Sequence, residues 1–165
     1  MIKITSSFLL VCCLFSTLVM ANVTLEKQLV ASINQQLEQS QRLLIETVNI
    51  NSGTQNFAGV KQVGMIFKQQ YDALGFTTQW LDGSEFARSG HLVATYESTS
   101  RPTSPKIMLI GHLDTVFAKD DSFQVATLLD NKRIAGPGIT DMKGGDVIML
   151  AALQALHKQG LLSHM

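Results

Sequence analysis

The sequence predicts an α/β domain in which helices flank a mixed sheet. Apolar residues spaced three and four apart indicate amphipathic helices over 24–49 and 57–74, and a densely apolar helix runs from about residue 142 to 159. Between these helices lie short segments rich in β-forming residues, with one apolar run at 106–110. Helices and strands in this order are expected to pack as layers around one core.

Length and charge narrow the class of protein. The chain has 165 residues, of which 45% are hydrophobic, and its formal net charge is zero. These values predict one small domain with a substantial core. A neutral balance offers no basic surface for nucleic acid, so we expect no nucleic-acid partner.

Residues 1–21 have the composition of a secretory signal peptide. Lys3 supplies the positive end, residues 8–20 form an apolar stretch, and Val19-Met20-Ala21 is a suitable cleavage site. The apolar stretch is shorter than the roughly 20 residues that span a bilayer, which favours cleavage over a stable membrane anchor. We therefore expect a mature chain of residues 22–165 that is secreted or periplasmic.

Both cysteines of the sequence, Cys12 and Cys13, fall inside this leader. The mature chain would then have no disulfide and no thiolate ligand, which suits an exported protein that does not depend on bridges. Any metal site would have to use imidazole and carboxylate groups.

The first two helices are predicted from their apolar stripes. In the first helix, apolar residues recur every four positions, at Leu25, Leu29, Ile33 and Leu37. Residues 51–54, Asn-Ser-Gly-Thr, form a turn signal after it. The second helix, 57–74, carries one core-facing stripe and is followed by Gly75, a residue type favoured just beyond a helix end.

The strands follow in order along the chain. Residues 76–81 and 91–96 read as strands, and 123–129 with 133–135 read as a hairpin around Asp130-Asn131-Lys132. The run Lys106-Ile107-Met108-Leu109-Ile110 is bounded by proline and glycine, and we expect it to be a strand buried on both faces.

The first candidate site residues follow that central strand. His112 and Asp114 are two apart, so in an extended segment they point to the same side. A carboxylate beside an imidazole can accept its ring N–H, fix its tautomer and raise the basicity of the other nitrogen, as behind many metal-bound histidines. The alternative is a histidine and an aspartate that only cap a loop.

The second candidate is Asp141, which stands between Gly136-Pro137-Gly138 and a helix that begins near Met142. Asp is favoured as a helix N-cap, which is one explanation of its place. Glycines on both sides let the backbone approach a bound group closely, and a carboxylate can bridge two cations, so a metal ligand is the other explanation.

The sequence lacks the motifs of two other classes of enzyme, the serine hydrolases and the phosphate-loop nucleotidases. The sequence has no Gly-x-Ser-x-Gly nucleophile motif and no Gly-x-x-x-x-Gly-Lys-Ser/Thr phosphate loop. Lys143 opposes the dipole of the helix that it begins, and either answers nearby carboxylates or is simply solvated. We expect His91, His157 and His164 not to be ligands.

Residues 111–116, Gly-His-Leu-Asp-Thr-Val, together with residues 136–145, Gly-Pro-Gly-Ile-Thr-Asp-Met-Lys-Gly-Gly, resemble the two-zinc exopeptidase and deacylase family. This family includes glutamate carboxypeptidase of the carboxypeptidase G type, aminoacylase and acetylornithine deacetylase. The residues after Asp114, the Gly-Pro-Gly before Asp141 and the 51–54 loop look most like the glutamate carboxypeptidase branch. The resemblance spans about residues 25–162.

The resemblance implies roles for three residues. His112 would ligate one Zn²⁺, Asp141 would bridge two Zn²⁺, and the Asp141–Met142 peptide would be cis. Asp114 would be the catalytic residue that orients His112. The reaction would be hydrolysis of the amide next to a C-terminal amino acid, typically glutamate, in a peptide or N-acyl amino acid. Zinc would lower the pKa of a water molecule and polarise the carbonyl.

The sequence also departs from the family pattern. There, a Glu-Glu pair supplies the general base and a zinc ligand after the last helix, followed by a lid domain, an acidic ligand and a distant histidine. The chain given ends at Met165, before these residues, and zinc prefers about four ligands. We therefore expect the incomplete front part of a zinc-exopeptidase catalytic domain, inactive alone. The alternatives are a non-catalytic remnant or interaction protein, and a deacylase relative.

Overall fold

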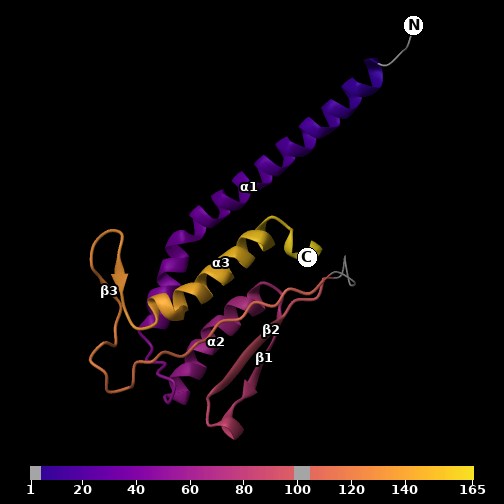
Figure 1. The fold of residues 1–165 in the computed structure, drawn as a ribbon. Helices are drawn as coiled ribbons and strands as arrows, with labels where there is room; N and C mark the ends of the chain where they lie inside the picture. The colour runs from indigo at the N-terminus through magenta and orange to yellow at the C-terminus, as the bar shows by residue number, and fades with distance from the viewer. Residues whose placement is uncertain (1–4, 99–104) are drawn as a thin grey trace.

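The computed structural model describes the backbone of residues 5–98 and 105–165, and within these ranges the side chains from residue 23 onward. It combines helices with small antiparallel sheets, so the predicted α/β class is confirmed (Figure 1). The elements are α1 (Thr5–Val48), α2 (Phe57–Ala73), β1 (Thr77–Asp82), β2 (Gly90–Thr95), β3 (Thr127–Leu128), β4 (Ile134–Ala135) and α3 (Gly144–Lys158), with short helical turns at Ser84–Phe86, Ile139–Lys143 and Leu162–His164.

The long helix α1 extends away from the rest of the molecule at its N-terminal end (Figure 1). Its backbone includes residues 5–21 of the predicted signal peptide, while residues 1–4 and the side chains of this segment lie outside the described residues. Of the predicted stripe, Leu25 and Leu29 are half-buried, but Ile33 and Leu37 are 40% and 62% exposed. The apolar contacts of α1 with the core therefore come from its C-terminal turns, whereas its middle meets α3 through the polar residues Ser32 and Gln36. No helix within the described ranges is long and apolar enough to cross a membrane.

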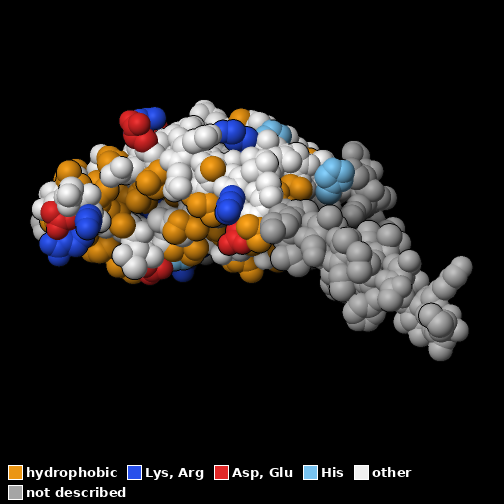
Figure 2. Space-filling model, turned by 90° about the horizontal axis from the view of Figure 1, so that it is seen from above, with side chains coloured by type: hydrophobic (Ala, Val, Ile, Leu, Met, Phe, Trp, Pro, Cys, Tyr) orange, Lys and Arg blue, Asp and Glu red, His pale blue; other side chains and the backbone are white. Residues whose placement is uncertain are grey.

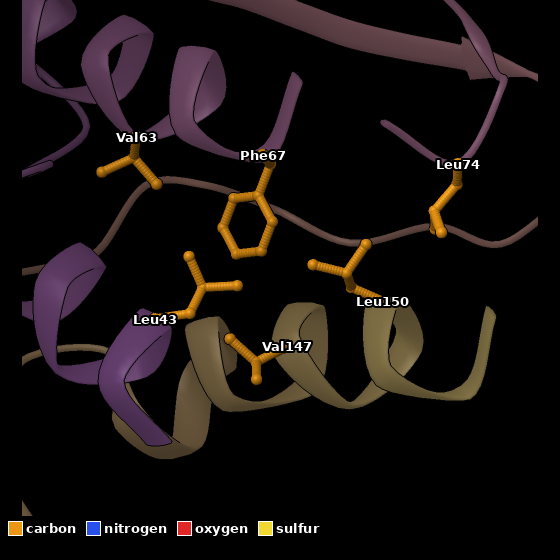
Figure 3. Close-up of a cluster of buried hydrophobic side chains, with 6 residues drawn as sticks. All are labelled: Leu43, Val63, Phe67, Leu74, Val147 and Leu150. Atoms are coloured by element: carbon orange, nitrogen blue, oxygen red, sulfur yellow. The ribbon is translucent and has the colours of Figure 1, made fainter. Parts of the chain in front are cut away.

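The core lies where the C-terminal end of α1 meets α2 and α3, and Figure 3 shows the side chains of all three helices converging there. The predicted stripe of α2 is confirmed from Val60 onward, since Val60, Phe67 and Leu74 are all buried, but Phe57 at its start is 37% exposed. Gly75 has the positive φ expected after the helix end. The cluster consists of Leu43, Val63, Phe67, Leu74, Val147 and Leu150.

The third helix is buried on one side only. Val147, Leu150 and Ala155 are almost inaccessible, whereas Ile148 is 70% exposed on another face. The dense apolar pattern over 142–159 predicts a helix that is buried over most of its circumference, and this prediction is wrong because the described residues pack against one side of α3.

The predicted hairpin is present as β3 and β4, and the two strands predicted at 76–81 and 91–96 are present as β1 and β2. Strands β1 and β2 pair antiparallel from Thr77↔Thr95 to Asp82↔Gly90, and they pack against α2. The contact is close because α2 presents Gly64, where an added Cβ would lie 2.4 Å from the Trp80 ring. Strands β3 and β4 form the shorter antiparallel pair, Thr127↔Ala135 and Leu128↔Ile134.

The expected central strand over 106–110 is wrong for the described structure. Ile107, Met108, Leu109 and Ile110 are 72%, 82%, 54% and 74% exposed, and the segment joins neither sheet. Apolar side chains are visible on the surface in Figure 2. An apolar run predicts burial only where other strands and helices cover it, and no described element pairs with this one. The segment is extended but unpaired.

Candidate metal centre

The segment that carries His112 passes between α2 and α3. A Cβ added to Gly111 would lie 2.1 Å from Oδ1 of Asp146 on α3, and one added to Gly64 on α2 would lie 3.0 Å from Leu113. Because these two positions are glycines, the segment fits between α2 and α3. His112 and Asp114 are thereby presented at the C-terminal end of the segment.

The structure brings His112 and Asp141 together although they are 29 positions apart. Nε2 of His112 lies 2.9 Å from Oδ1 of Asp141. The Asp141 side chain is 81% exposed, and the described residues offer it no other hydrogen bond. It does not cap α3, whose N-cap residue is Lys143, so the capping explanation does not apply. The Asp141–Met142 peptide is cis, as the resemblance implies.

Asp114 lies behind the imidazole. Nδ1 of His112 is 3.0 Å from the backbone oxygen of Asp114 and 3.5 Å from its carboxylate Oδ1. Both ring nitrogens thus face acceptors. Partial burial disfavours the charged ring, but the hydrogen bonds to Asp141 and to the Asp114 carbonyl, with the two negative charges, outweigh it and raise the pKa of His112.

A loop from the end of α1 holds Asp114. Gly53 and Thr115 form an isolated parallel bridge, in which Thr115 N–H donates to Ser52 O at 2.9 Å and Thr54 N–H donates to Thr115 O at 3.0 Å. The Thr54 hydroxyl donates to Oδ2 of Asp114 at 2.6 Å. The sequence predicts a turn at residues 51–54, and the resemblance includes this loop, but neither singles out Thr54.

Lys143 anchors the turn that carries Asp141, the partner of His112. Its side chain is fully buried, and Nζ donates to the backbone oxygens of Thr47 at 2.8 Å and Ile50 at 3.1 Å, at the C-terminal end of α1. Burial lowers the pKa of Lys143 to about 8. The expectation of a solvated group is wrong. Lys143 does interact with one nearby carboxylate, Asp146, through its charge, but its side-chain hydrogen bonds go to backbone oxygens. The signal that could have found it is a lysine among glycines at the unfavourable end of a helix.

Asp146 is a buried carboxylate in the first turn of α3. It is 6% exposed, and its Oδ2 atom has no hydrogen-bond partner among the described residues. Desolvation raises the pKa of Asp146 to about 6, against the opposing charges of His112 and Lys143. Sequence reasoning missed this residue, because an aspartate in the first turn of a helix is ordinarily favourable and exposed.

A cavity of about 350 Å³ opens over these residues. The predicted site residues lie on its wall together with Thr54 and backbone from the 136–138 glycine turn. No lysine or arginine is among the lining residues, and neither is His91, His157 or His164. The lining residues are Thr54, His112, Asp114, Thr115, Val116, Phe117, Gly136, Gly138, Thr140 and Asp141.

The donor set fits part of a zinc site. Two neighbouring ligands of one tetrahedral zinc are about 3.3 Å apart, which is close to the 2.9 Å between Nε2 of His112 and Oδ1 of Asp141. Within the described ranges, no three His, Cys, Asp or Glu side chains gather around one point. The pair would supply two ligands of such a site, and a complete site would need others.

Comparison with known proteins agrees with this geometry. Residues 108–164, which contain His112, Asp114 and Asp141, match the family described as Peptidase family M20/M25/M40. The matched segment makes up about one third of the chain. The chain is also similar to Carboxypeptidase G2 of Pseudomonas sp. (strain RS-16), with 26% identity over 120 residues. That match covers 73% of the chain and 28% of the relative, so the chain spans little more than a quarter of the relative it matches.

Proposed function

We propose that the chain contributes the front part of the active site of an exported zinc metallopeptidase of the glutamate carboxypeptidase type. The observation that carries the proposal is the 2.9 Å approach of His112 Nε2 to Asp141 Oδ1, within the segment that matches the M20 family. Residues 1–21 would serve as the signal peptide. The substrate would be a peptide or N-acyl amino acid with a free C-terminal carboxylate.

Each residue would have a defined task. His112 would offer Nε2 and Asp141 its carboxylate to zinc, and Asp114 would hold the imidazole from the Nδ1 side. Zinc, when bound, supplies Lewis acidity toward the scissile carbonyl and lowers the pKa of water. The general base and the remaining ligands would come from polypeptide beyond the residues described here. The chain alone would therefore be inactive.

Recognition of the substrate carboxylate would also need residues other than those that line the cavity beside His112 and Asp141. None of the lining residues is a lysine or arginine, while Asp114 and Asp141 both carry negative charge. A carboxylate is bound most strongly by a cationic partner. The glutamate specificity therefore rests on the resemblance to the glutamate carboxypeptidase branch and on the similarity to Carboxypeptidase G2.

A chimera tests the proposal. Residues of this chain would replace the aligned 120-residue segment of Carboxypeptidase G2, and release of glutamate from a peptidyl-glutamate would be followed with added Zn²⁺. The chimera is expected to be active, and His112→Ala and Asp141→Asn within it are expected to abolish the release. The variant Lys68→Met, on the exposed side of α2, is the matched control for folding.

Two results would overturn the proposal. One is a folded, zinc-binding chimera that retains full activity after His112→Ala or Asp141→Asn. The other is hydrolysis by residues 22–165 alone, which would mean that the base lies within this chain.

A further inference from the structure

The carboxylate of Asp114 is held from two sides. Oδ1 faces Nδ1 of His112 at 3.5 Å, and Oδ2 accepts a hydrogen bond from the Thr54 hydroxyl at 2.6 Å. The second contact is short and charge-assisted, so it is the stronger of the two. It joins residues that are 60 positions apart.

The Thr54 hydroxyl has two acceptors within reach but only one proton. The other acceptor is the backbone oxygen of Thr115 at 3.2 Å, which already accepts from the Thr54 N–H at 3.0 Å. The ionised carboxylate at 2.6 Å is nearer and carries more negative charge. The Thr54 hydroxyl therefore donates its hydrogen bond to the Asp114 carboxylate.

The backbone alone already joins the two loops. Thr115 N–H donates to Ser52 O, and Asn51 binds the backbone oxygen of Ala118 at 3.1 Å and the side chain of Gln124 at 2.7 Å. The Thr54 hydroxyl is not needed for that connection. What it adds is the direction of the Asp114 side chain, which is one-third exposed and would otherwise be free to turn toward solvent.

We propose that Thr54 is a positioning residue of the metal centre, whose hydroxyl holds the Asp114 carboxylate behind the His112 ring. The inference rests on the proposed function, because it assigns Thr54 to the orientation of a zinc ligand. Partners of this kind are commonly worth about 10–100-fold in metal affinity. Thr54 acts only through Asp114.

The chain offers a matched control. Thr78 on β1 also donates its hydroxyl to an aspartate, Asp72, but on the exposed surface between α2 and β1. Thr54→Val and Thr78→Val each replace a hydroxyl with a methyl group of the same shape and remove one Thr–Asp hydrogen bond. Thr54→Ser keeps the donor.

The experiment measures Zn²⁺ affinity of the full chain by isothermal titration calorimetry, and the ¹⁵N chemical shifts of the His112 ring in EDTA-treated protein at one fixed pH. Thr54→Val is expected to weaken zinc binding about tenfold and to move the Nδ1 resonance. Thr54→Ser is expected to restore both, and Thr78→Val to change neither. Circular dichroism confirms that each variant is folded.

The proposal is overturned if Thr54→Val leaves the Nδ1 resonance of His112 unchanged, or if Thr54→Ser is impaired as much as Thr54→Val. The two failures are distinguishable. If the parent chain and His112→Ala bind Zn²⁺ equally, the proposed function fails, and the ring resonances, recorded without metal, still decide the role of Thr54.

Discussion

Nζ of Lys143 lies 2.8 Å from the backbone oxygen of Thr47, so a fully buried ammonium group fastens the turn that carries Asp141 to the last turn of α1. The last carbonyls of a helix lack partners within the helix, and this lysine satisfies one of them from another element. The main chain of Lys143 also donates to Gly138 O at 2.8 Å, which closes the turn on itself.

Removing the charge of Lys143 should destabilise the fold. Lys143→Met keeps the length of the side chain but removes its hydrogen bonds to the oxygens of Thr47 and Ile50, and Thr47 O then keeps only a long bond of 3.4 Å from the Ile50 N–H. We expect a loss of about 2–4 kcal/mol in the free energy of unfolding, measured in urea. Lys68→Met, which breaks an exposed ion pair with Asp72, should cost less than about 1 kcal/mol. Equal losses for the two variants would contradict the role of Lys143.

Zinc should stabilise the chain through the His112–Asp141 pair. A ligand present at about 100 times its Kd adds about 2.7 kcal/mol to the stability of the state that binds it. Zn²⁺ is therefore expected to raise the Tm of the parent chain, and EDTA to reverse the rise. The rise should be absent in His112→Ala and in Asp141→Asn. A rise of the same size in all three proteins would place zinc elsewhere.

Asp146 should make stability depend on pH. Burial raises the pKa of Asp146 from 3.8 to about 6, so between these values the folded state binds more protons than the unfolded state. The contribution of this group is fully present below pH 3.8 and is lost as the pH rises through about 6. Asp146→Asn removes the dependence, so its stability relative to the parent should increase by up to about 3 kcal/mol from about pH 4 to about pH 7.5, measured by urea unfolding. A difference that does not change with pH would refute this prediction.

The exposed segment 107–110 should promote self-association. Four consecutive apolar side chains on an extended, unpaired backbone can template strand pairing between molecules. The double variant Met108→Lys, Ile110→Lys is expected to reduce light scattering of concentrated protein, while Val125→Lys, at a 58% exposed site in another loop, should not. Scattering that is unaffected by the double variant would exclude this segment as the contact.

Local patterns predicted the elements whose partners are close in sequence. The α2 stripe, the strands β1 and β2 and the β3–β4 hairpin follow from spacing and turn residues, and Phe57–Ala73 differs from the predicted helix 57–74 by one residue. The run at 106–110 failed because its burial depends on elements that pack across it, which no local pattern reports. The exposure of Ile33 and Leu37 has the same cause.

The residues of the candidate site also fall into those that local patterns predicted and those that depend on distant partners. Residue type and spacing singled out His112, Asp114 and Asp141, which the structure brings onto the wall of one cavity. Thr54 and Lys143 were missed or misjudged because their partners, Asp114 and Thr47, are 60 and 96 positions away. A hydroxyl or an ammonium group gains such a role only when the fold brings a distant acceptor to it.

The attachment of both loops to the end of α1 has a consequence for motion. Thr54 reaches Asp114 from the loop that leaves this helix, and Lys143 ties the Asp141 turn to its last carbonyls. The segments that carry His112 and Asp141 are therefore both attached to the same end of α1. If that helix end moves, the imidazole and the carboxylate move with it in the same direction. The distance between the two side chains is therefore preserved when the helix end moves. Truncating or unwinding α1 would remove the shared attachment and disturb the pair, although no residue of the helix belongs to it.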